Sequence, residues 1–189
     1  FFRKESIAML KMEGKDIVLT VLEREDCRRI WQDNEYDFAH PGEDFNIGHS
    51  VEKADQWFEE IQRLQGDRNV RLGIFLRDGT VIGDVALQDI DRMNRSCSVG
   101  MGISRLEYRS KGYGGQALAL ILRLAFEHMG LERVTANTLA TNPGARRSLE
   151  RAGFVLEGIQ RQAVYLGGRR IDRLNFAMLR EDYFAQSAR

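Results

Sequence analysis

The segment from Ser96 to Leu139 constrains the fold of this chain more than any other part of it. A β-prone run at 96–104 is followed by a glycine-rich stretch, Arg109-Ser-Lys-Gly-Tyr-Gly-Gly115, and then by an apolar stretch. The apolar stretch predicts a helix over 112–129, because Gly130 can adopt the left-handed conformation that closes a helix. A second β-prone run lies at 132–139. A strand, a helix and a strand in this order form a right-handed crossover, so the two strands are expected to be parallel neighbours.

The first turn of this helix contains two features that are unfavourable in an unliganded helix. Each of its three glycines, Gly112, Gly114 and Gly115, costs about 0.5–1 kcal/mol relative to alanine. Arg109 and Lys111 place positive charge at the positive end of the helix dipole. A bound pyrophosphate would account for both, because glycines let it approach the free amides while the cations neutralise its charge. The alternative is a glycine-softened helix entry with a solvated charge run.

The rest of the chain predicts an α/β protein with a mixed sheet and helices on its faces. Helices are expected at 23–33, 50–64 and 142–153, and further strands at 16–22, 70–77, 81–89, 154–165 and 171–178. Asp78-Gly79 predicts a hairpin, and Ser50 and Asn142 are typical N-cap residues. Since the 189 residues include no Pro/Gly/Ser-rich linker, one domain is expected over about 12–183, with about seven strands and about four helices.

Composition excludes several classes of function. Lys plus Arg equals Asp plus Glu at 28 each, so no basic excess indicates a nucleic-acid partner. Cys27 and Cys97 match no metal-site spacing, the three histidines form no metal pair, and no metal is expected. The longest apolar stretch, 117–126, is shorter than the ~20 residues of a membrane span. A two-cysteine chain of this size does not need disulfides, so a reducing, cytoplasmic location is expected. The first residues lack the long apolar region of a signal peptide.

Other phosphate-binding motifs do not fit the glycine-rich stretch. The chain holds no Gly-x-x-x-x-Gly-Lys-Ser/Thr, and Gly112-x-Gly114-Gly115 lacks the third glycine position and the downstream acid of a dinucleotide fingerprint. Arg109-x-x-Gly112-x-Gly114 instead matches Arg/Gln-x-x-Gly-x-Gly/Ala, the acyl-CoA signature of the GNAT superfamily of N-acetyltransferases, at the place where that family has it.

Two further segments extend this resemblance. Residues 142–154 begin Asn-Pro-Gly-Ala and end Gly-Phe, which is similar to the family's Asn-x-x-Ser/Ala motif, helix and Gly-Phe. Leu156-Glu-Gly158 and the segment 167–172, Gly-Gly-Arg-Arg-Ile-Asp, resemble the branch that contains the ribosomal-protein N-terminal (alanine) acetyltransferases. The resemblance implies the GNAT acyl-CoA N-acyltransferase fold and covers nearly the whole chain.

The resemblance also implies an enzyme that transfers the acetyl group of acetyl-CoA, as co-substrate, to a primary amine. The implied acceptor is a small molecule or a protein N-terminus. The resemblance leaves open whether the enzyme forms a homodimer. In this family the strand equivalent to 96–104 separates from its parallel neighbour, and its unpaired backbone groups bind pantetheine like an added strand. Gly100 and Gly102 fit such close backbone approach, although glycines in an edge strand have a structural explanation that is equally good. The residues implied in cofactor binding are Met101, Gly102, Ile103, Arg109, Ser110, Lys111, Gly112, Tyr113, Gly114, Gly115, Asn142 and Arg147.

The family's acids and bases are missing from this chain. The tyrosine seven residues after the motif asparagine is replaced by Leu149, and the serine three residues after it by Ala145. A carboxylate before the signature is replaced by Ser98, and a glutamate near the sixth strand by Val164. Ser98 and Tyr165 remain as weak catalytic candidates. We therefore expect direct attack of the amine on the thioester in a ternary complex, helped by positioning and by a backbone amide at the oxyanion.

The loop between the first two expected helices is acidic and aromatic. Its acids are Glu35, Asp37, Glu43 and Asp44, and its aromatic residues are Tyr36, Phe38 and Phe45. The acids could attract a cationic amine, or they could simply keep a surface loop solvated. Two functions other than catalysis stay open. A GNAT-fold module could sense acetyl-CoA without turnover, which the missing acid and base would explain, and a regulatory domain could bind nucleotide phosphates.

Overall fold

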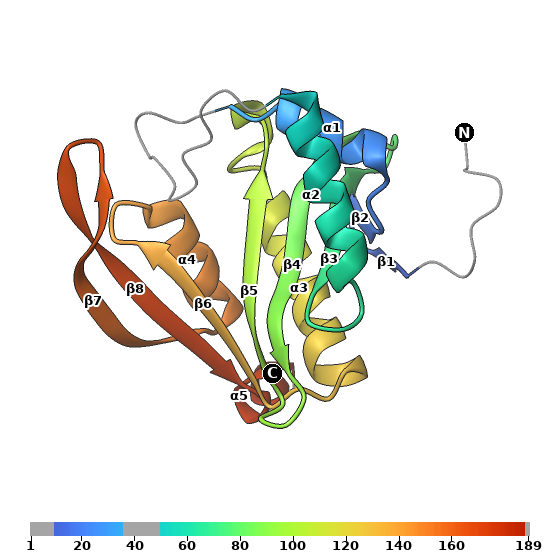
Figure 1. Cartoon of the computed structure of the whole chain (residues 1–189). Coiled ribbons are helices and arrows are strands. Elements are labelled where there is room, and N and C mark those ends of the chain that lie inside the picture. The colour runs from blue at the N-terminus through green and yellow to red at the C-terminus, as the bar shows by residue number, and fades with distance from the viewer. Residues whose placement is uncertain (1–9, 36–49, 188–189) are drawn as a thin grey trace.

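The computed structural model describes residues 10–35 and 50–187, and its framework is one eight-stranded mixed sheet (Figure 1). The strand order is β1-β2-β3-β4-β5-β6-β8-β7, and of these neighbours only β5 and β6 run parallel. The strands are β1 (Lys11–Glu13), β2 (Ile17–Thr20), β3 (Val70–Leu76), β4 (Val81–Asp91), β5 (Ser96–Ile103), β6 (Arg133–Leu139), β7 (Val155–Leu166) and β8 (Arg169–Leu179). The predicted mixed sheet, the hairpin at Asp78-Gly79 and the parallel crossover pair are confirmed. The sequence analysis missed β1, which is too short to show a period.

Helices cover both faces of this sheet. One face carries α1 (Arg24–Gln32) and α2 (Val51–Leu64), and the other carries α3 (Tyr113–Arg123) and α4 (Pro143–Ala152) (Figure 1). The alternation of strand side chains sends Ile74 and Ile82 into the core beneath α3, while their neighbours Phe75 and Val81 join the cluster beneath α1 and α2. The sheet therefore has two separate apolar contacts, one for each helical layer.

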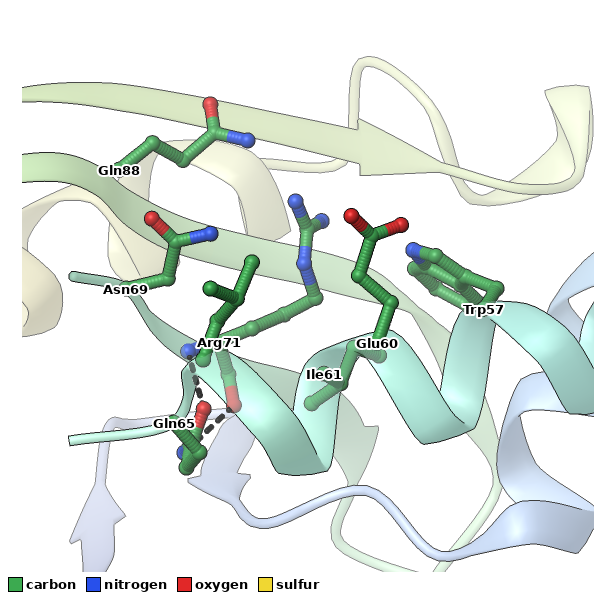
Figure 2. Close-up of a pocket in the computed structure, with 8 residues that line it drawn as sticks. Trp57, Glu60, Ile61, Gln65, Asn69, Arg71 and Gln88 are labelled. Atoms are coloured by element: carbon green, nitrogen blue, oxygen red, sulfur yellow. Dashed lines mark hydrogen bonds between the residues drawn. The ribbon is translucent and has the colours of Figure 1, made fainter. Parts of the chain in front are cut away.

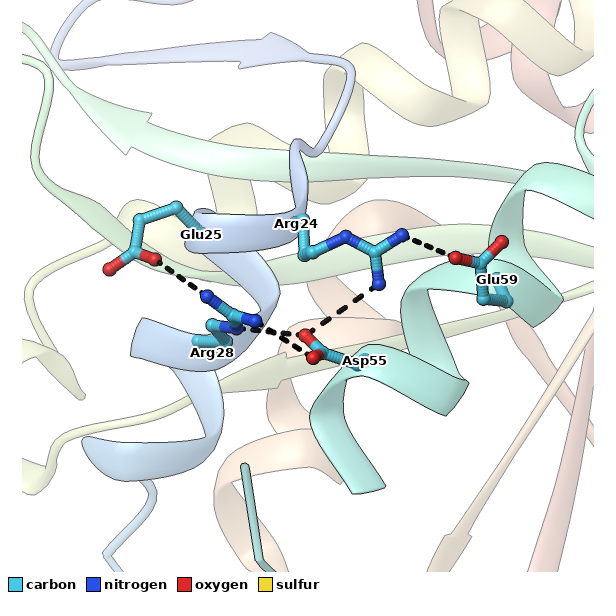
Figure 3. Close-up of polar contacts among 5 residues, drawn as sticks. All are labelled: Arg24, Glu25, Arg28, Asp55 and Glu59. Atoms are coloured by element: carbon cyan, nitrogen blue, oxygen red, sulfur yellow. Dashed lines mark hydrogen bonds and ion pairs between the residues drawn. The ribbon is translucent and has the colours of Figure 1, made fainter. Parts of the chain in front are cut away.

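Ion pairs, which Figure 3 shows, and a pair of aromatic rings join α1 to α2. The Arg28 guanidinium donates two hydrogen bonds of 2.8 Å to the Asp55 carboxylate, and these bonds lower the pKa of Asp55. Arg24 pairs with both Asp55 and Glu59. The rings of Trp31 and Trp57 lie 5.8 Å apart between the same helices. Because several charges share one network, the two helices are fixed to each other as a unit above the sheet.

The predicted helix starts are correct, but their capping differs. The Asn142 side chain accepts a hydrogen bond of 3.0 Å from the Ala145 amide and so caps α4 as expected. Glu23 and Asp26 form a capping box at the start of α1. Ser50 occupies the N-cap position of α2 without the predicted side-chain capping bond. Its hydroxyl hydrogen bonds to the Glu52 carboxylate instead, which lowers the pKa of Glu52.

The long helix that starts at Tyr113 does not keep an α-helical pitch to its end. It changes at Leu124–His128 into a π turn and closes at Gly130, whose φ of 65° is left-handed. Arg180 donates a hydrogen bond to the Phe126 carbonyl within this turn. Tyr183 stacks on Phe126 with centroids 5.0 Å apart, and burial raises the pKa of Tyr183 to about 12. Arg180 and Tyr183 belong to α5 (Arg180–Ser187), a helix that the sequence analysis did not predict.

The parallel pair β5–β6 is short, and this shortness determines the shape of the sheet. Pairing joins Ser96, Cys97 and Ser98 to residues 133–135 and then stops. Beyond Ser98, β5 stays paired with β4 as far as Ile103, whereas β6 follows β8 to Leu139. Figure 1 shows the ends of the two strands separating. The expected opening between parallel neighbours is thus present in this chain.

Gly83 allows β4 to approach β5 closely at the end of this opening. A Cβ atom added there would lie 2.0 Å from the Gly102 carbonyl oxygen, a distance that requires the two strands to move apart. We predict that Gly83→Ala lowers the free energy of unfolding by about 1–3 kcal/mol, the usual cost of overpacking. Urea unfolding would measure this change, with Gly158→Ala as the control because no heavy atom lies within 4 Å of a Cβ added to that strand glycine. Equal losses in both variants would contradict the steric explanation.

Candidate functional site

The free edge of β5 forms one wall of the candidate site. Met101, Gly102 and Ile103 lie beyond the last β5–β6 pair, so that only their β4 side is occupied by a neighbouring strand. The Met101 and Gly102 residues are exposed, and Ile103 is half-buried. A strand edge of this kind can pair its backbone groups with an extended ligand. The structure therefore brings together the three residues that the sequence analysis selected on this strand.

The glycine-rich loop lies between this edge and the start of α3. Ser110 has a φ of 60° and Gly112, the N-cap of α3, a φ of 85°. A left-handed conformation is uncommon for a serine and costs of order 1–3 kcal/mol, a strain that proteins concentrate at functional sites. Cβ atoms added at Gly112 or Gly115 would meet no heavy atom within 4 Å, and one at Gly114 would meet only Met101, at 3.8 Å. The helix start is thus open to an approaching group.

Arg109 fixes this loop to the end of β5. Its Nε and Nη2 atoms donate hydrogen bonds of 3.2 and 3.1 Å to the Ile103 carbonyl, and Nη2 also donates to the Glu35 carbonyl at 3.3 Å. The sequence analysis assigned Arg109 to neutralising an anion. In the structure its guanidinium positions the loop, and its contact with an anion stays a prediction.

The segment after α1 is attached to the same place. The Arg105 guanidinium pairs with Asp33 at 2.7 Å, and these contacts raise the pKa of Arg105. The Leu106 amide donates to the Glu35 carboxylate at 2.6 Å, and the Glu35 amide donates to the Ser104 carbonyl at 2.9 Å. The acidic segment predicted to recruit the acceptor thus starts beside the glycine-rich loop. The other members of this segment lie outside the described residues: Tyr36, Asp37, Phe38, Glu43, Asp44 and Phe45. His40 and His49 also lie outside them.

The start of α4 supplies the second predicted motif. The Asn142 side chain serves as the helix cap, Arg146 pairs with Glu150 within the helix at 2.7 Å, and Arg147 is exposed. Leu149 occupies the position where many family members have a tyrosine, and it is 6% exposed within the core. A packing residue has therefore taken the place of the usual proton donor.

Two polar residues of β4, Asp84 and Gln88, escaped the sequence analysis. The strand register sets Asp84 opposite Gly102 and Gln88 opposite Ser98, and residues that face each other across an antiparallel pair share one side of the sheet. The alternating residues Val85, Leu87 and Val99 are buried in the core beneath α3. The polar residues consequently face α1 and α2. Residues 84–88 read Asp-Val-Ala-Leu-Gln, so the apolar run 85–87 hides the alternation of the two faces, and the acid inside the predicted strand 81–89 was the local signal.

A cavity of about 170 Å³ lies on this polar face, between α2 and strands β3 and β4 (Figure 2). The Arg71 guanidinium lies 5.5 Å from the Trp57 ring and pairs with the buried Asp84 carboxylate. The Gln65 side chain holds the Arg71 backbone through hydrogen bonds of 2.9 and 3.1 Å. The lining residues are Trp57, Glu60, Ile61, Leu64, Gln65, Asn69, Arg71 and Gln88.

The two weak catalytic candidates lie in different places. The Ser98 hydroxyl donates a 3.4 Å hydrogen bond to the Gln88 carbonyl, at the point where β5 and β6 part. Tyr165 is 67% exposed on β7 and lies under the Arg170 guanidinium, on a part of the β7–β8 hairpin that extends beyond the pairing with β6. Two strands, β6 and β8, separate β7 from β5. The structure does not bring Tyr165 to Ser98.

The cysteines do not offer a nucleophile. Cys27 and Cys97 are 0% and 4% exposed, and burial raises the pKa of each thiol to about 12. A thiol with that pKa is almost fully protonated at neutral pH, and the thiolate is the reactive form.

Within the described ranges no group of three or more His, Cys, Asp or Glu side chains is arranged to hold a metal ion, and His128 is exposed. No helix there has the length and apolar character of a membrane span.

Comparison with known proteins agrees with this geometry. The family model described as the acetyltransferase (GNAT) domain matches residues 16–155. The chain belongs to the GNAT acetyltransferase family. Within this family it resembles YdaF of Bacillus subtilis, a candidate ribosomal N-acetyltransferase, with 27% identity over 174 residues that cover 90% of this chain and 94% of YdaF. The spermidine N(1)-acetyltransferase of Vibrio cholerae is 26% identical over 182 residues, which cover 92% and 99% of the two chains.

Solved structures show the same fold. A chimera of the Vibrio cholerae spermidine N-acetyltransferase SpeG with hSSAT superposes with a TM-score of 0.80 over 90% of this chain and 99% of the other, at 22% identity. The predicted family, the GNAT fold and the N-acetyltransferase activity are confirmed. GNAT acetyltransferases use acetyl-CoA as co-substrate, so the open helix start and the free strand edge lie in an enzyme that handles this ligand.

The burial of the cysteines leads to a prediction about the native enzyme. We predict that neither Cys27 nor Cys97 is labelled by a disulfide reagent at neutral pH within the time in which unfolded protein is labelled completely, because both thiols are buried and protonated. The absorbance of the coloured thiolate that the reagent releases measures the labelling, and the protein in denaturant is the reference. Rapid labelling of one thiol in the native state would show that a cysteine is accessible to substrates.

Proposed function

We propose that this enzyme transfers the acetyl group of acetyl-CoA to a primary amine within a ternary complex, with a protein N-terminus as the acceptor. One observation carries the cofactor part of the proposal: the free edge of β5 ends beside the glycine-rich start of α3, where added Cβ atoms at Gly112 and Gly115 would meet nothing. An extended arm and a pyrophosphate need these two kinds of surface next to each other.

Each part of the site has a distinct role in the proposed complex. Met101, Gly102 and Ile103 hold the pantetheine arm through their backbone groups, and Arg109 keeps the loop in place. The pyrophosphate binds at the start of α3, with the loop residues Ser110, Lys111, Gly112, Tyr113, Gly114 and Gly115. Asn142 contacts the arm from the start of α4, and Arg147 meets the nucleotide phosphates. All of these residues fall within the single domain proposed over 12–183, and the continuous sheet from β1 to β8 supports that assignment.

Direct transfer fits the residues present. Acetyl-CoA supplies an activated thioester, and the protein holds the amine in line with its carbonyl carbon. Positioning of this kind supplies several kcal/mol of the barrier, and a β5 backbone amide stabilises the oxyanion. The buried, protonated cysteines argue against an acetyl-cysteine intermediate. Ser98 lies at the opening and gives polar assistance, whereas the exposed Tyr165 contributes at most to the acceptor side.

The proposed acceptor rests on the sequence of β7 and β8 and on a relative. The segments 156–158 and 167–172 resemble the ribosomal-protein branch, and YdaF is a candidate ribosomal N-acetyltransferase. Spermidine is the competing acceptor, because a second relative is a spermidine N(1)-acetyltransferase. A sensing module without turnover is the remaining alternative, which the buried Leu149 in place of a proton donor favours.

We predict that CoA and acetyl-CoA raise the melting temperature of the protein, and that ATP and NAD do so much less, since only CoA combines a pyrophosphate with an extended arm. At a hundredfold excess over its Kd, the ligand adds about 2.7 kcal/mol to the free energy of unfolding. Gly114→Val should abolish most of this shift by filling the open helix start. Ala119→Val adds a β-branched side chain to the exposed face of the same helix and is the control. No shift with millimolar CoA would refute the cofactor site.

We predict that a peptide with a free N-terminus is acetylated faster than spermidine, and spermidine faster than an anionic amine. Release of CoA thiol measures each rate, and the buried cysteines should add little background. A blocked peptide of the same sequence is the control for N-terminal transfer. Preference for spermidine would assign the polyamine as the acceptor, and binding of acetyl-CoA without thiol release for any amine would support the sensing module.

A further inference from the structure

Asp84 is an acid whose burial the helices and strands do not explain. Among the described residues only two acidic side chains are buried, Asp26 and Asp84, at 5% and 9% exposure. The Asp26 carboxylate caps α1 by accepting from the Glu23 amide at 2.9 Å. Asp84 caps no helix, because it lies within β4, on the polar face of the sheet. Its burial therefore calls for a different role.

The position of Asp84 places it next to the proposed thioester. It faces Gly102 across the β4–β5 ladder, in the middle of the segment Met101–Ile103. A Cβ atom added at Gly102 would lie 4.0 Å from the Asp84 Oδ1 atom, so this carboxylate oxygen lies beside the Gly102 backbone. The carboxylate and the free edge of β5 thus border the same space on the side of α1 and α2.

Arg71 holds the carboxylate in this position. Its Nη1 atom donates to Asp84 Oδ2, and the two side chains are 18% and 13% exposed. Arg71 is held in turn by the Trp57 ring and by the Gln65 side chain (Figure 2). A group whose orientation is fixed before the substrate binds loses little entropy in the reaction. Oδ1 is the carboxylate oxygen on the Gly102 side, toward the free edge of β5.

A purely structural role explains this pair poorly. Removing two charges from water is costly, and a buried ion pair is often no more stabilising than apolar residues of the same volume. Val81, on the same strand, is buried in the apolar cluster beneath α1 and α2, so this face of β4 also packs apolar side chains.

We propose that Asp84 is a catalytic residue of the acetyl transfer, and that Arg71 is its positioning residue; the inference rests on the proposed function. Asp84 Oδ1 accepts a hydrogen bond from the attacking amine. The nitrogen attacks the thioester carbonyl carbon, its proton moves to Oδ1, and the C–N bond forms. The C–S bond then breaks, and the departing sulfur takes the proton from Oδ1. One amine and one acetyl-CoA thus give one amide and one CoA thiol.

The test compares Asp84→Asn with the double variant Arg71→Gln/Asp84→Asn. The single variant leaves the Arg71 charge buried without its anion, so it can lose stability as well as activity. The double variant removes both charges and restores a neutral pair. If Asp84 is catalytic, kcat falls about a hundredfold or more in both variants, the usual range for a lost general base, while the Kd of acetyl-CoA is unchanged. Asp89→Asn, an exposed change on the same strand, is the control.

Three measurements separate the outcomes: thiol release with the preferred amine, acetyl-CoA affinity, and melting temperature. A double variant that is folded, binds acetyl-CoA and stays inactive supports the proposal. A double variant that regains activity together with its melting temperature overturns it, because the pair would then be structural. Failure of the wild-type protein to bind acetyl-CoA would instead refute the proposed function, and the two failures are thereby distinguished.

Discussion

The separation of β5 from β6 is the constraint on which the rest of this structure depends. A strand that leaves its parallel neighbour after Ser98 exposes backbone donors and acceptors, which are normally paired in a protein interior. The chain tolerates this exposure because β4 holds the other edge of β5 as far as Ile103, with Gly83 in close contact with Gly102. The opening therefore occurs at one edge only, and the sheet stays continuous at its base.

The loops around the opening are arranged by hydrogen bonds to the same strand end. Arg109 donates to the Ile103 carbonyl, and the Glu35 amide donates to that of Ser104. The segment after α1, the glycine-rich loop and β5 consequently form one connected region. The left-handed Ser110 lies within this region. A conformation of this cost persists when the surrounding contacts determine it, and these hydrogen bonds supply such contacts.

The two faces of the sheet differ in chemistry as well as in helical cover. Beneath α3 the strands contribute aliphatic side chains such as Val85, Leu87 and Val99, which form the larger core. Beneath α1 and α2 the same strands contribute Asp84, Gln88 and Ser98 together with glycines. The stability of the domain comes mainly from the first face. The second face is left available for chemistry, and the ion pairs between α1 and α2 keep those helices in place above it.

The sequence by itself determined the family and the alternation of strands and helices, and it selected the segments that are proposed to bind the cofactor. Local signals sufficed for these, because the glycines of 112–115, the Asn142 cap and the Asp78-Gly79 turn act on neighbouring residues. The missed elements depend on distant contacts: α5 packs on the π turn through Tyr183 and Phe126, and β1 is only three residues long. The tertiary structure alone decided what Arg109 contacts, that Tyr165 lies apart from Ser98, and that Asp84 faces Gly102. Strand register and side-chain direction join residues far apart in the chain, and no local pattern encodes such a pairing.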